Sequence, residues 1–198
     1  VVYQKWGFIK NIINQELNRG GQVYFLHNRI ESISFYEKKV LELLPDASVA
    51  SAHGGMNSRD LEKIIISFYE GKTQVLITTT IIEAGLDVPN ANTIIITAAH
   101  MYGLSQLYQI RGRVGRGDRQ GFCYLVIPKE EGLTDDAIER LKTIQENTDL
   151  GSGYRIAIKD LELRGAGNLF GYDQSGHVSS VGYHLYCKMF NDELKESK

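Results

Sequence analysis

The chain has 198 residues, a formal net charge of −2 and an apolar fraction of 42%, values that fit one globular domain with an appendage. No apolar run approaches the roughly 20 residues that span a bilayer, and no signal-peptide pattern opens the chain, so no membrane partner is expected. The two cysteines, Cys123 and Cys187, are too few for a disulfide framework and indicate a reducing, cytoplasmic compartment.

Helical and extended patterns alternate along the first 128 residues. Apolar side chains at helical spacing predict a first helix over 6–17, which ends at Gly20-Gly21. Short apolar runs without alternation are typical of strands buried on both faces. Further helices are predicted at about 33–44, 57–68, 80–84 and 104–113, and strands at 23–26, 48–52, 75–77, 93–97 and 122–127.

Five short strands alternating with helices predict an α/β fold, a parallel sheet with helices on both faces. Ligands of such sheets bind at the carboxyl ends of the strands. Candidate binding residues therefore lie in the loops that follow the strands: Asn28, His53-Gly54-Gly55, Thr78-Thr79-Thr80, His100 and Pro128.

The pattern changes after Pro128, where no sixth strand is evident. Helices are expected after Thr134, at 154–163 and from about Val178, with a glycine-rich loop through Gly176 before the last one. We therefore predict a sheet domain at 1–128 and a C-terminal helical hairpin appendage at 129–198.

Two of the predicted helices have a clear N-cap and a clear buried face. Asn57 can cap the third helix and Thr134 the first appendage helix. The side chains expected to face the core are Leu61, Ile64, Ile65 and Phe68 in the former and Ile138, Leu141 and Ile144 in the latter.

Four arginines lie within nine positions, at Arg111, Arg113, Arg116 and Arg119. A local basic stripe can bind phosphate even in a slightly acidic chain. Within it, the segment Gln109-Ile110-Arg111-Gly112-Arg113-Val114-Gly115-Arg116 places Arg113 and Arg116 three residues apart, on one face of a helix. Two guanidinium groups so placed suit a triphosphate, whose terminal oxygens gain charge in the transition state. A solvated basic helix end is the alternative.

A second segment, Val75 to Pro89, runs from a strand into three threonines and then a helix start. Free backbone N–H groups and hydroxyls at such a position can bind phosphate. Asp87 can accept hydrogen bonds from a ribose. The alternative is a threonine N-cap followed by a structural aspartate, and the segment alone favours neither.

Together, and in this order, the two segments resemble the second, RecA-like motor domain of superfamily 2 helicases and translocases. Thr79, Gly85 and Asp87 match the fifth motif of that superfamily, and Gln109, Gly112, Arg113, Gly115 and Arg116 match its sixth. The resemblance implies that Thr79 touches a nucleic-acid phosphate and that Asp87 lies near the ATP ribose. It also implies that Arg113 and Arg116 reach the γ-phosphate as arginine fingers.

The stretch Asp160 to Gly171, continued by Gln174-Ser175-Gly176, resembles the translocation motif of double-stranded-DNA translocases. In that group a helical hairpin couples ATP hydrolysis to movement along the duplex, and Arg140, Arg164 and Gln174 match its functional residues. A dinucleotide-binding loop is the alternative for the glycines, but charged residues precede them where a buried strand is required.

Two translocase families share this motif, the bacterial transcription-repair coupling factors and the fork-regressing branched-DNA helicases. Residues 24–29, 149–154 and 181–186 resemble the coupling factors, and an insertion common after the first strand of the helicases is missing. The coupling-factor reading implies RNA polymerase and excision-repair proteins as partners. Tyr108 departs from the histidine usual in the family. The fork-regression helicase and a non-catalytic DNA-binding half-motor remain as alternatives.

Neither a phosphate-binding loop ending in Gly-Lys-Ser/Thr nor an Asp-Glu magnesium box occurs in the sequence. ATP and Mg²⁺ are therefore expected to bind mainly on another domain, which the resemblance places before residue 1, and this chain alone is expected to be inactive. The start at Val1 and the charged end at 193–198 fit a piece of a longer polypeptide.

The remaining candidates are weaker. His53 and Gly54 match a stretch that lies near DNA in relatives, and Asn28 ends the first strand as in the coupling factors. The histidines form no metal-ligand spacing with either cysteine, so no metal site is expected. Tyr102, Tyr108 and Tyr124 are expected to pack internally.

Overall fold

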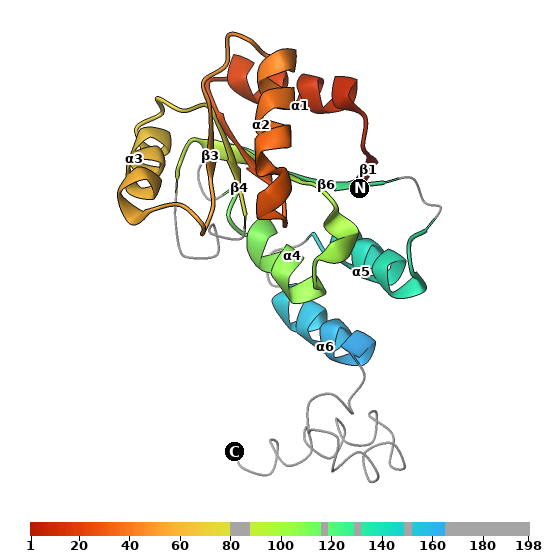
Figure 1. Ribbon diagram of the computed structural model, residues 1–198. Coiled ribbons are helices and arrows are strands. Elements are labelled where there is room, and N and C mark those ends of the chain that lie inside the picture. The colour runs from red at the N-terminus through yellow and green to blue at the C-terminus, as the bar shows by residue number, and fades with distance from the viewer. Residues whose placement is uncertain (80–87, 116–118, 129–131, 149–151, 165–198) are drawn as a thin grey trace, which may run out of the picture. The chain divides into compact units, whose positions relative to one another are not determined.

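The structure is a computed structural model that describes residues 1–79, 88–115, 119–128, 132–148 and 152–164 (Figure 1). The chain divides into two compact units, Val1–Glu146 and Asn147–Lys198. The first unit holds the sheet. In the second, the structure describes helix α6 at Gly153–Arg164, which confirms the helix predicted at 154–163. The domain boundary predicted after residue 128 stays a prediction, and helix α5 lies within the first unit.

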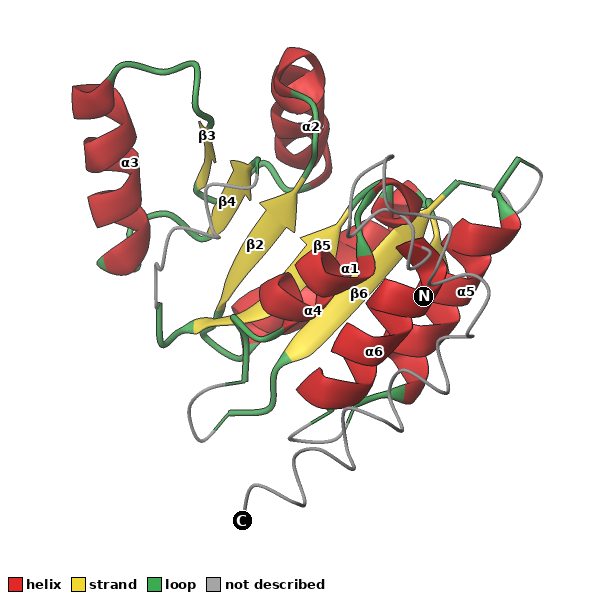
Figure 2. Cartoon of the chain, turned by 90° about the horizontal axis from the view of Figure 1, so that it is seen from below, coloured by secondary structure: helices red, strands yellow, loops and turns green. Residues whose placement is uncertain are grey.

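Six parallel strands form the sheet, in the order β1-β6-β5-β2-β4-β3. Figure 2 shows β3, β4, β2, β5 and β6 side by side in this order. Their bounds are Val2–Tyr3 for β1, Gln22–Leu26 for β2, Val49–Ala52 for β3, Val75–Thr78 for β4, Ala91–Ile96 for β5 and Phe122–Ile127 for β6. All five predicted strands are present. The sixth, β1, was not predicted, because a strand of two residues leaves no periodicity in the sequence; Val2 pairs with Val126 of β6.

The predicted helices that fall within the described residues are all present. They are α1 at Trp6–Asn18, α2 at Ile30–Leu43, α3 at Ser58–Tyr69, α4 at Leu104–Arg111 and α5 at Asp135–Glu146, with a 3₁₀ turn, η2, at Ala99–Met101. Both predicted N-caps are confirmed. The Asp60 amide donates to the Asn57 side chain over 3.0 Å, and the Ala137 amide donates to Thr134 Oγ1 over 3.3 Å. The helices predicted at 80–84 and from Val178 lie outside the described residues.

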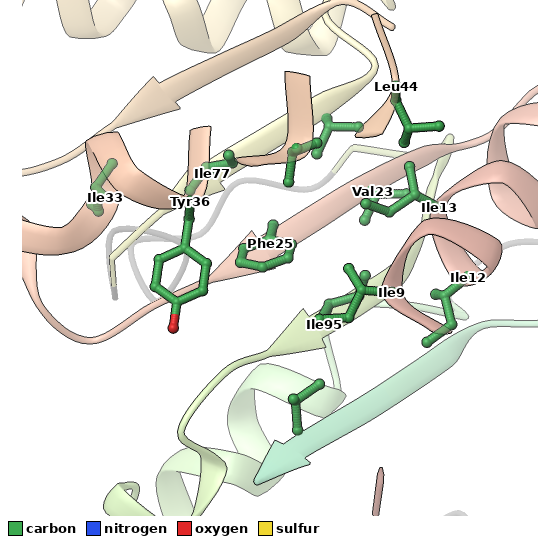
Figure 3. Packing of buried hydrophobic residues seen from close by; sticks show 13 residues of the cluster. Ile9, Ile12, Ile13, Val23, Phe25, Ile33, Tyr36, Leu44, Ile77 and Ile95 are labelled. Carbon is green, nitrogen blue, oxygen red and sulfur yellow. The ribbon is translucent and has the colours of Figure 1, made fainter. Parts of the chain in front are cut away.

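Successive residues of β2 pack into two different cores, because side chains alternate across a sheet. Val23 and Phe25 lie in a buried cluster with residues of α1 and α2 (Figure 3). Tyr24 points the other way and packs against Phe68 of α3, with ring centroids 4.9 Å apart. Helices therefore cover both faces of the parallel sheet, and the predicted fold class is confirmed.

Helix α3 buries less of its apolar face than expected. Of the four side chains predicted to face the core, Phe68 is fully buried, while Leu61, Ile64 and Ile65 are half-buried. The helix packs chiefly on β3, which is the last strand of the sheet. A helix over the edge of a sheet has less surface to cover it, so three of the four predicted residues are only partly covered.

Helix α5 packs on α4 and on η2 within the first unit. Its buried side chains include Ala137, Leu141 and Ile144, whereas Ile138 is half-buried. The apolar face predicted for this helix therefore meets the segments that follow β5.

Candidate functional site

The loops that follow the strands bring four of the predicted binding residues to one edge of the sheet, here called the carboxyl edge. Leu26, the last residue of β2, is level with Thr78 of β4 and Ile96 of β5, and Thr78 is level with Ala52 of β3. The residues that come next therefore share this edge: Asn28, His53, Gly54 and Thr79. Asn28 and His53 are half-buried and Gly54 is exposed. Thr79 is only 9% exposed, so little of its side chain is open to a ligand.

Buried His27 fixes the start of the loop that carries Asn28. Its Nδ1 lies 2.8 Å from Thr97 Oγ1, whose hydroxyl donates to the Leu26 carbonyl over 2.9 Å. Its Nε2 lies 2.6 Å from Ser32 Oγ. Because the Thr97 hydroxyl proton is already donated, Nδ1–H donates to Thr97. In the neutral ring Nε2 is then an acceptor for the Ser32 hydroxyl, which also lies 3.4 Å from the Arg29 carbonyl. Burial, and then the charge of Arg29, lower the pKa of His27, which favours the neutral ring.

The loop after β3 is a tight turn that leaves Gly54 open. The Gly55 amide donates to His53 Nδ1 over 3.2 Å, and the Met56 amide donates to the His53 carbonyl over 3.1 Å. A Cβ added at Gly54 would meet no atom within 4 Å. A ligand could therefore approach the Gly54 backbone closely.

The arginine segment leaves the helix earlier than the sequence predicts. Helix α4 ends at Arg111, and the Arg113 amide donates to the Ile110 carbonyl over 3.0 Å in a tightened last turn. Gly115 then has a φ of +73°, a left-handed conformation that favours glycine. Arg113 therefore lies in a turn beyond the helix, not on its face, while exposed Gln109 lies on α4.

Arg111 and Arg119, two of the clustered arginines, bind main-chain carbonyls. Arg111 Nη1 donates to the Ile144 carbonyl of α5 over 2.8 Å, and its Cζ lies 5.2 Å from the centroid of the Tyr108 ring. Arg119 Nη1 donates to the Arg19 carbonyl over 3.2 Å. Part of the basic stripe therefore has a structural role, and Arg113 is half-buried.

The arginine loop, defined as the described residues 112–115 and 119–121, closes through a contact between two glycines. A Cβ added at Gly121 would lie 2.4 Å from the Gly115 nitrogen and 2.6 Å from its Cα. Phe122, the next residue, pairs with Thr93 near the start of β5. The loop therefore closes at the amino edge of the sheet, and the structure separates it from the residues gathered at the carboxyl edge.

At the same amino edge lie Glu16 and Arg19, which sequence reasoning missed. Glu16 is 2% exposed, and Arg19 donates to it. The buried position of Glu16 could have been predicted from the sequence. Glu16 falls at helical spacing from Ile9, Ile12 and Ile13, on a face predicted to be buried.

Arg140, expected to couple hydrolysis to movement, connects α5 to the loop after β5. Its Nη2 donates to the His100 carbonyl over 3.0 Å. Burial, and then the charge of Arg140, lower the pKa of His100. Arg164 is the last residue of α6, and the position of its side chain is not described.

Five predicted site residues, Thr80, Gly85, Asp87, Arg116 and Gln174, lie outside the described residues. In the part of the chain that is described, no group of three His, Cys, Asp or Glu side chains could hold a metal ion. No described helix is long and apolar enough to cross a lipid bilayer. Burial raises the pKa of Cys123 to about 12, so its thiol is not a nucleophile at neutral pH.

The tyrosines were expected to pack internally, and the structure agrees. Tyr102 is 2% exposed, Tyr108 lies under Arg111 and Tyr124 stacks on Phe122 with centroids 6.3 Å apart. These rings are therefore engaged within the first unit.

Residues 4–118 match the helicase conserved C-terminal domain family. The whole chain is 50% identical to the transcription-repair-coupling factor of Staphylococcus haemolyticus and 48% identical to that of Staphylococcus aureus strain USA300. The chain spans 17% of the length of these curated relatives.

Solved helicase structures are also similar to this chain. The structure of RecG bound to a three-way DNA junction is 32% identical and has a TM-score of 0.74, over 95% of this chain and 24% of the RecG chain. The C-terminal domain of the DEAD-box protein Dbp5 has a TM-score of 0.55 at 16% identity, over 79% of this chain and 89% of that one. The second likeness shows the fold alone.

Proposed function

The chain belongs to the helicase conserved C-terminal domain family, and on that premise we propose that it is the second motor domain of an ATP-dependent double-stranded-DNA translocase of the transcription-repair coupling type. The observation that carries the proposal is the 50% identity to a coupling factor along all 198 residues, appendage included. The fold, with one set of candidate residues at the carboxyl edge and an arginine loop at the amino edge, is compatible with a separate nucleic-acid track and nucleotide contact.

The arginine loop is the proposed contact to ATP. Arg113 and Arg116 approach the γ-phosphate bound on another domain, and Gln109 on α4 supports them. Gly85 and Asp87 contact the nucleotide from the segment after β4. Guanidinium groups stabilise the charge that develops on the transferred phosphoryl group, and Mg²⁺, which the other domain would mainly hold, would supply further positive charge to the phosphates. This chain alone is therefore proposed to be inactive.

The carboxyl edge is the proposed DNA track. Asn28, His53 and Gly54 present polar side chains and an open backbone, and Thr79 and Thr80 follow at the end of β4. Contacts of this kind bind the phosphate backbone and carry no sequence information. A motor that moves along any duplex needs this type of contact.

Coupling between the two regions is proposed to pass through Arg140, Arg164 and Gln174. ATP binding on the other domain draws Arg113 and Arg116 toward the γ-phosphate, into the cleft between the two domains. Closure of this cleft advances the DNA-binding residues along the duplex. Hydrolysis then releases the two domains from each other. In the full polypeptide this stepping acts on a stalled RNA polymerase in the bacterial cytoplasm and leads to recruitment of excision-repair proteins.

A fork-regression helicase is the second candidate, favoured by the RecG structure with its three-way DNA junction. The identity to RecG is 32%, against 50% to the coupling factor, and this difference favours the first reading. A non-catalytic half-motor is the weakest candidate, because Arg113, Arg116 and Asp87 are all present.

The test uses the full polypeptide that contains this chain and a phosphate-binding domain. DNA-stimulated ATP hydrolysis and displacement of a triplex-forming strand are measured for the parent and for Arg164→Ala and Gln174→Ala. We expect both variants to keep hydrolysis and to lose displacement. Displacement at the parental rate would remove the coupling role. Removal of stalled RNA polymerase, compared with regression of a model fork, separates the two translocase readings.

A further inference from the structure

Arg19 matches none of the motifs identified in the sequence. At the amino edge it contacts both α1 and the end of the arginine loop. It caps the C-terminus of α1. Its guanidinium donates from Nε to Glu16 Oε2 over 2.9 Å and from Nη2 both to that oxygen and to the Gln120 carbonyl, the latter over 3.0 Å. Its Cζ also lies 5.0 Å from the centroid of the Phe122 ring. One side chain therefore connects α1 to the residues that end the arginine loop.

The connection is made in both directions. Arg119 Nη1 donates to the Arg19 carbonyl over 3.2 Å, while Arg19 donates to the carbonyl of Gln120, the next residue. Each arginine thus binds the main chain of the other segment. Main-chain carbonyls cannot be removed by substitution, so these two hydrogen bonds can be removed only by changing the arginines.

Glu16 holds Arg19 in place. Its carboxylate is 2% exposed and also accepts from the Thr93 hydroxyl of β5. A Cβ at Gly21 would lie 1.6 Å from Glu16 Oε1, so glycine at 21 leaves the room that the carboxylate occupies. Glu16 Oε2 accepts both from Arg19 and from the Thr93 hydroxyl, so the buried carboxylate lies between α1 and β5.

The contacts continue from Gln120 to Arg113. Gly121 follows Gln120 and touches the backbone of Gly115, as the 2.4 Å separation of a hypothetical Cβ from the Gly115 nitrogen shows. Gly115 is two residues from Arg113. Arg19 thus binds residues 119–121 of the arginine loop, and residues 112–115 of the loop contact residues 119–121.

We infer that Glu16 and Arg19 form a positioning pair that holds the arginine loop, and with it Arg113, in the geometry that ATP hydrolysis requires. The inference rests on the proposed function. Neither residue touches the nucleotide in this scheme, since both act through Gln120, Gly121 and Gly115. Small displacements of a catalytic group have large effects on rate, of about a hundredfold for 1 Å.

The test compares Arg19→Ala and Arg19→Lys in the full polypeptide. Lysine can still pair with Glu16, but it lacks the fork that reaches the Gln120 carbonyl as well. We expect each variant to lower kcat for DNA-stimulated ATP hydrolysis by about tenfold or more, with the KM for ATP and the DNA affinity within about twofold of the parent. Arg119→Lys, which can still donate to the Arg19 carbonyl, should restore most of the rate relative to Arg119→Ala.

Hydrogen exchange at the amides of 113–115 and 119–121 gives a second readout, which should quicken in both Arg19 variants. Lys39→Ala removes a pair of the same (i, i+3) spacing on α2, where Lys39 Nζ lies 2.8 Å from Glu42 Oε2, and should change neither readout. Parental kcat in Arg19→Lys would overturn the inference. Parental kcat in Arg113→Ala would instead overturn the proposed function, so the two failures are distinguishable.

Discussion

The two candidate regions of the sheet are held in different ways. At the carboxyl edge, one buried histidine, His27, fixes the start of a loop, and a Cβ added at Gly54 would meet no atom within 4 Å. At the amino edge, arginine–carbonyl hydrogen bonds and a contact between Gly115 and Gly121 hold the arginine loop. Phosphate-backbone contacts tolerate small shifts, whereas a group that stabilises a transition state does not. The tighter construction therefore lies where the proposed chemistry requires it.

The largest effect is expected from the arginines themselves. Arg113→Ala or Arg116→Ala in the full polypeptide should lower DNA-stimulated ATP hydrolysis by about 10³-fold or more, because an arginine finger stabilises the charge of the transition state. DNA affinity without nucleotide should stay near that of the parent. Steady-state hydrolysis at saturating DNA measures the effect, with Lys63→Ala on exposed α3 as the control. Retained turnover would remove the finger assignment.

A pair of glycine substitutions compares the two regions directly. Gly121→Ala places a Cβ against the Gly115 backbone, whereas Gly54→Ala places one in open space. We expect the first to lower the free energy of unfolding by about 2 kcal/mol and the second to change it by less than about 0.5 kcal/mol. Urea denaturation of both variants measures the difference. Equal stabilities would show that the glycine contact does not hold the arginine loop.

Substitutions at the carboxyl edge should affect DNA binding more than hydrolysis. Asn28→Ala and Thr79→Ala should each weaken DNA binding by about fivefold, the equivalent of one hydrogen bond, and kcat at saturating DNA should change little. Fluorescence anisotropy at two salt concentrations measures the affinity. Thr79 is mostly buried, so an effect confined to Asn28 would assign Thr79 a structural role.

The smallest effect concerns the protonation of His27. Its pKa is lowered on folding, so the stability it contributes is fully present above the pKa of the unfolded chain, about 6.5. This stability is lost as the pH falls toward the lower pKa of the folded state, because the unfolded state then binds more protons. We expect the free energy of unfolding to fall less steeply between pH 7.5 and 5.5 in His27→Gln than in the parent.

The control for this measurement is Gly54→Ala, at the same edge, which removes no titratable group and should keep the parental slope. Chemical denaturation at several pH values gives the free energies. Equal slopes for His27→Gln and the parent would show that folding does not lower the pKa of His27.

The sheet could be predicted because its strands are apolar on both faces and its helices are amphipathic. The two-residue strand β1 could not, since it depends on pairing with Val126. For the site, residue type and spacing selected Arg113, but the end of α4 at Arg111 depends on glycines and on contacts with α5. The contact between Arg19 and the Gln120 carbonyl could not be predicted, because it joins positions 101 residues apart. The proposed role of Glu16 and Arg19 depends on this contact.

Helix α5 also bears on where the chain can be divided. Two arginine–carbonyl hydrogen bonds join it to the segments after β5, from Arg111 to the Ile144 carbonyl and from Arg140 to the His100 carbonyl. A chain that stopped at Pro128 would lose both bonds and would expose the apolar surface that Leu141 and Ile144 cover. A separately expressed sheet domain should therefore end at Glu146, so that it retains α5.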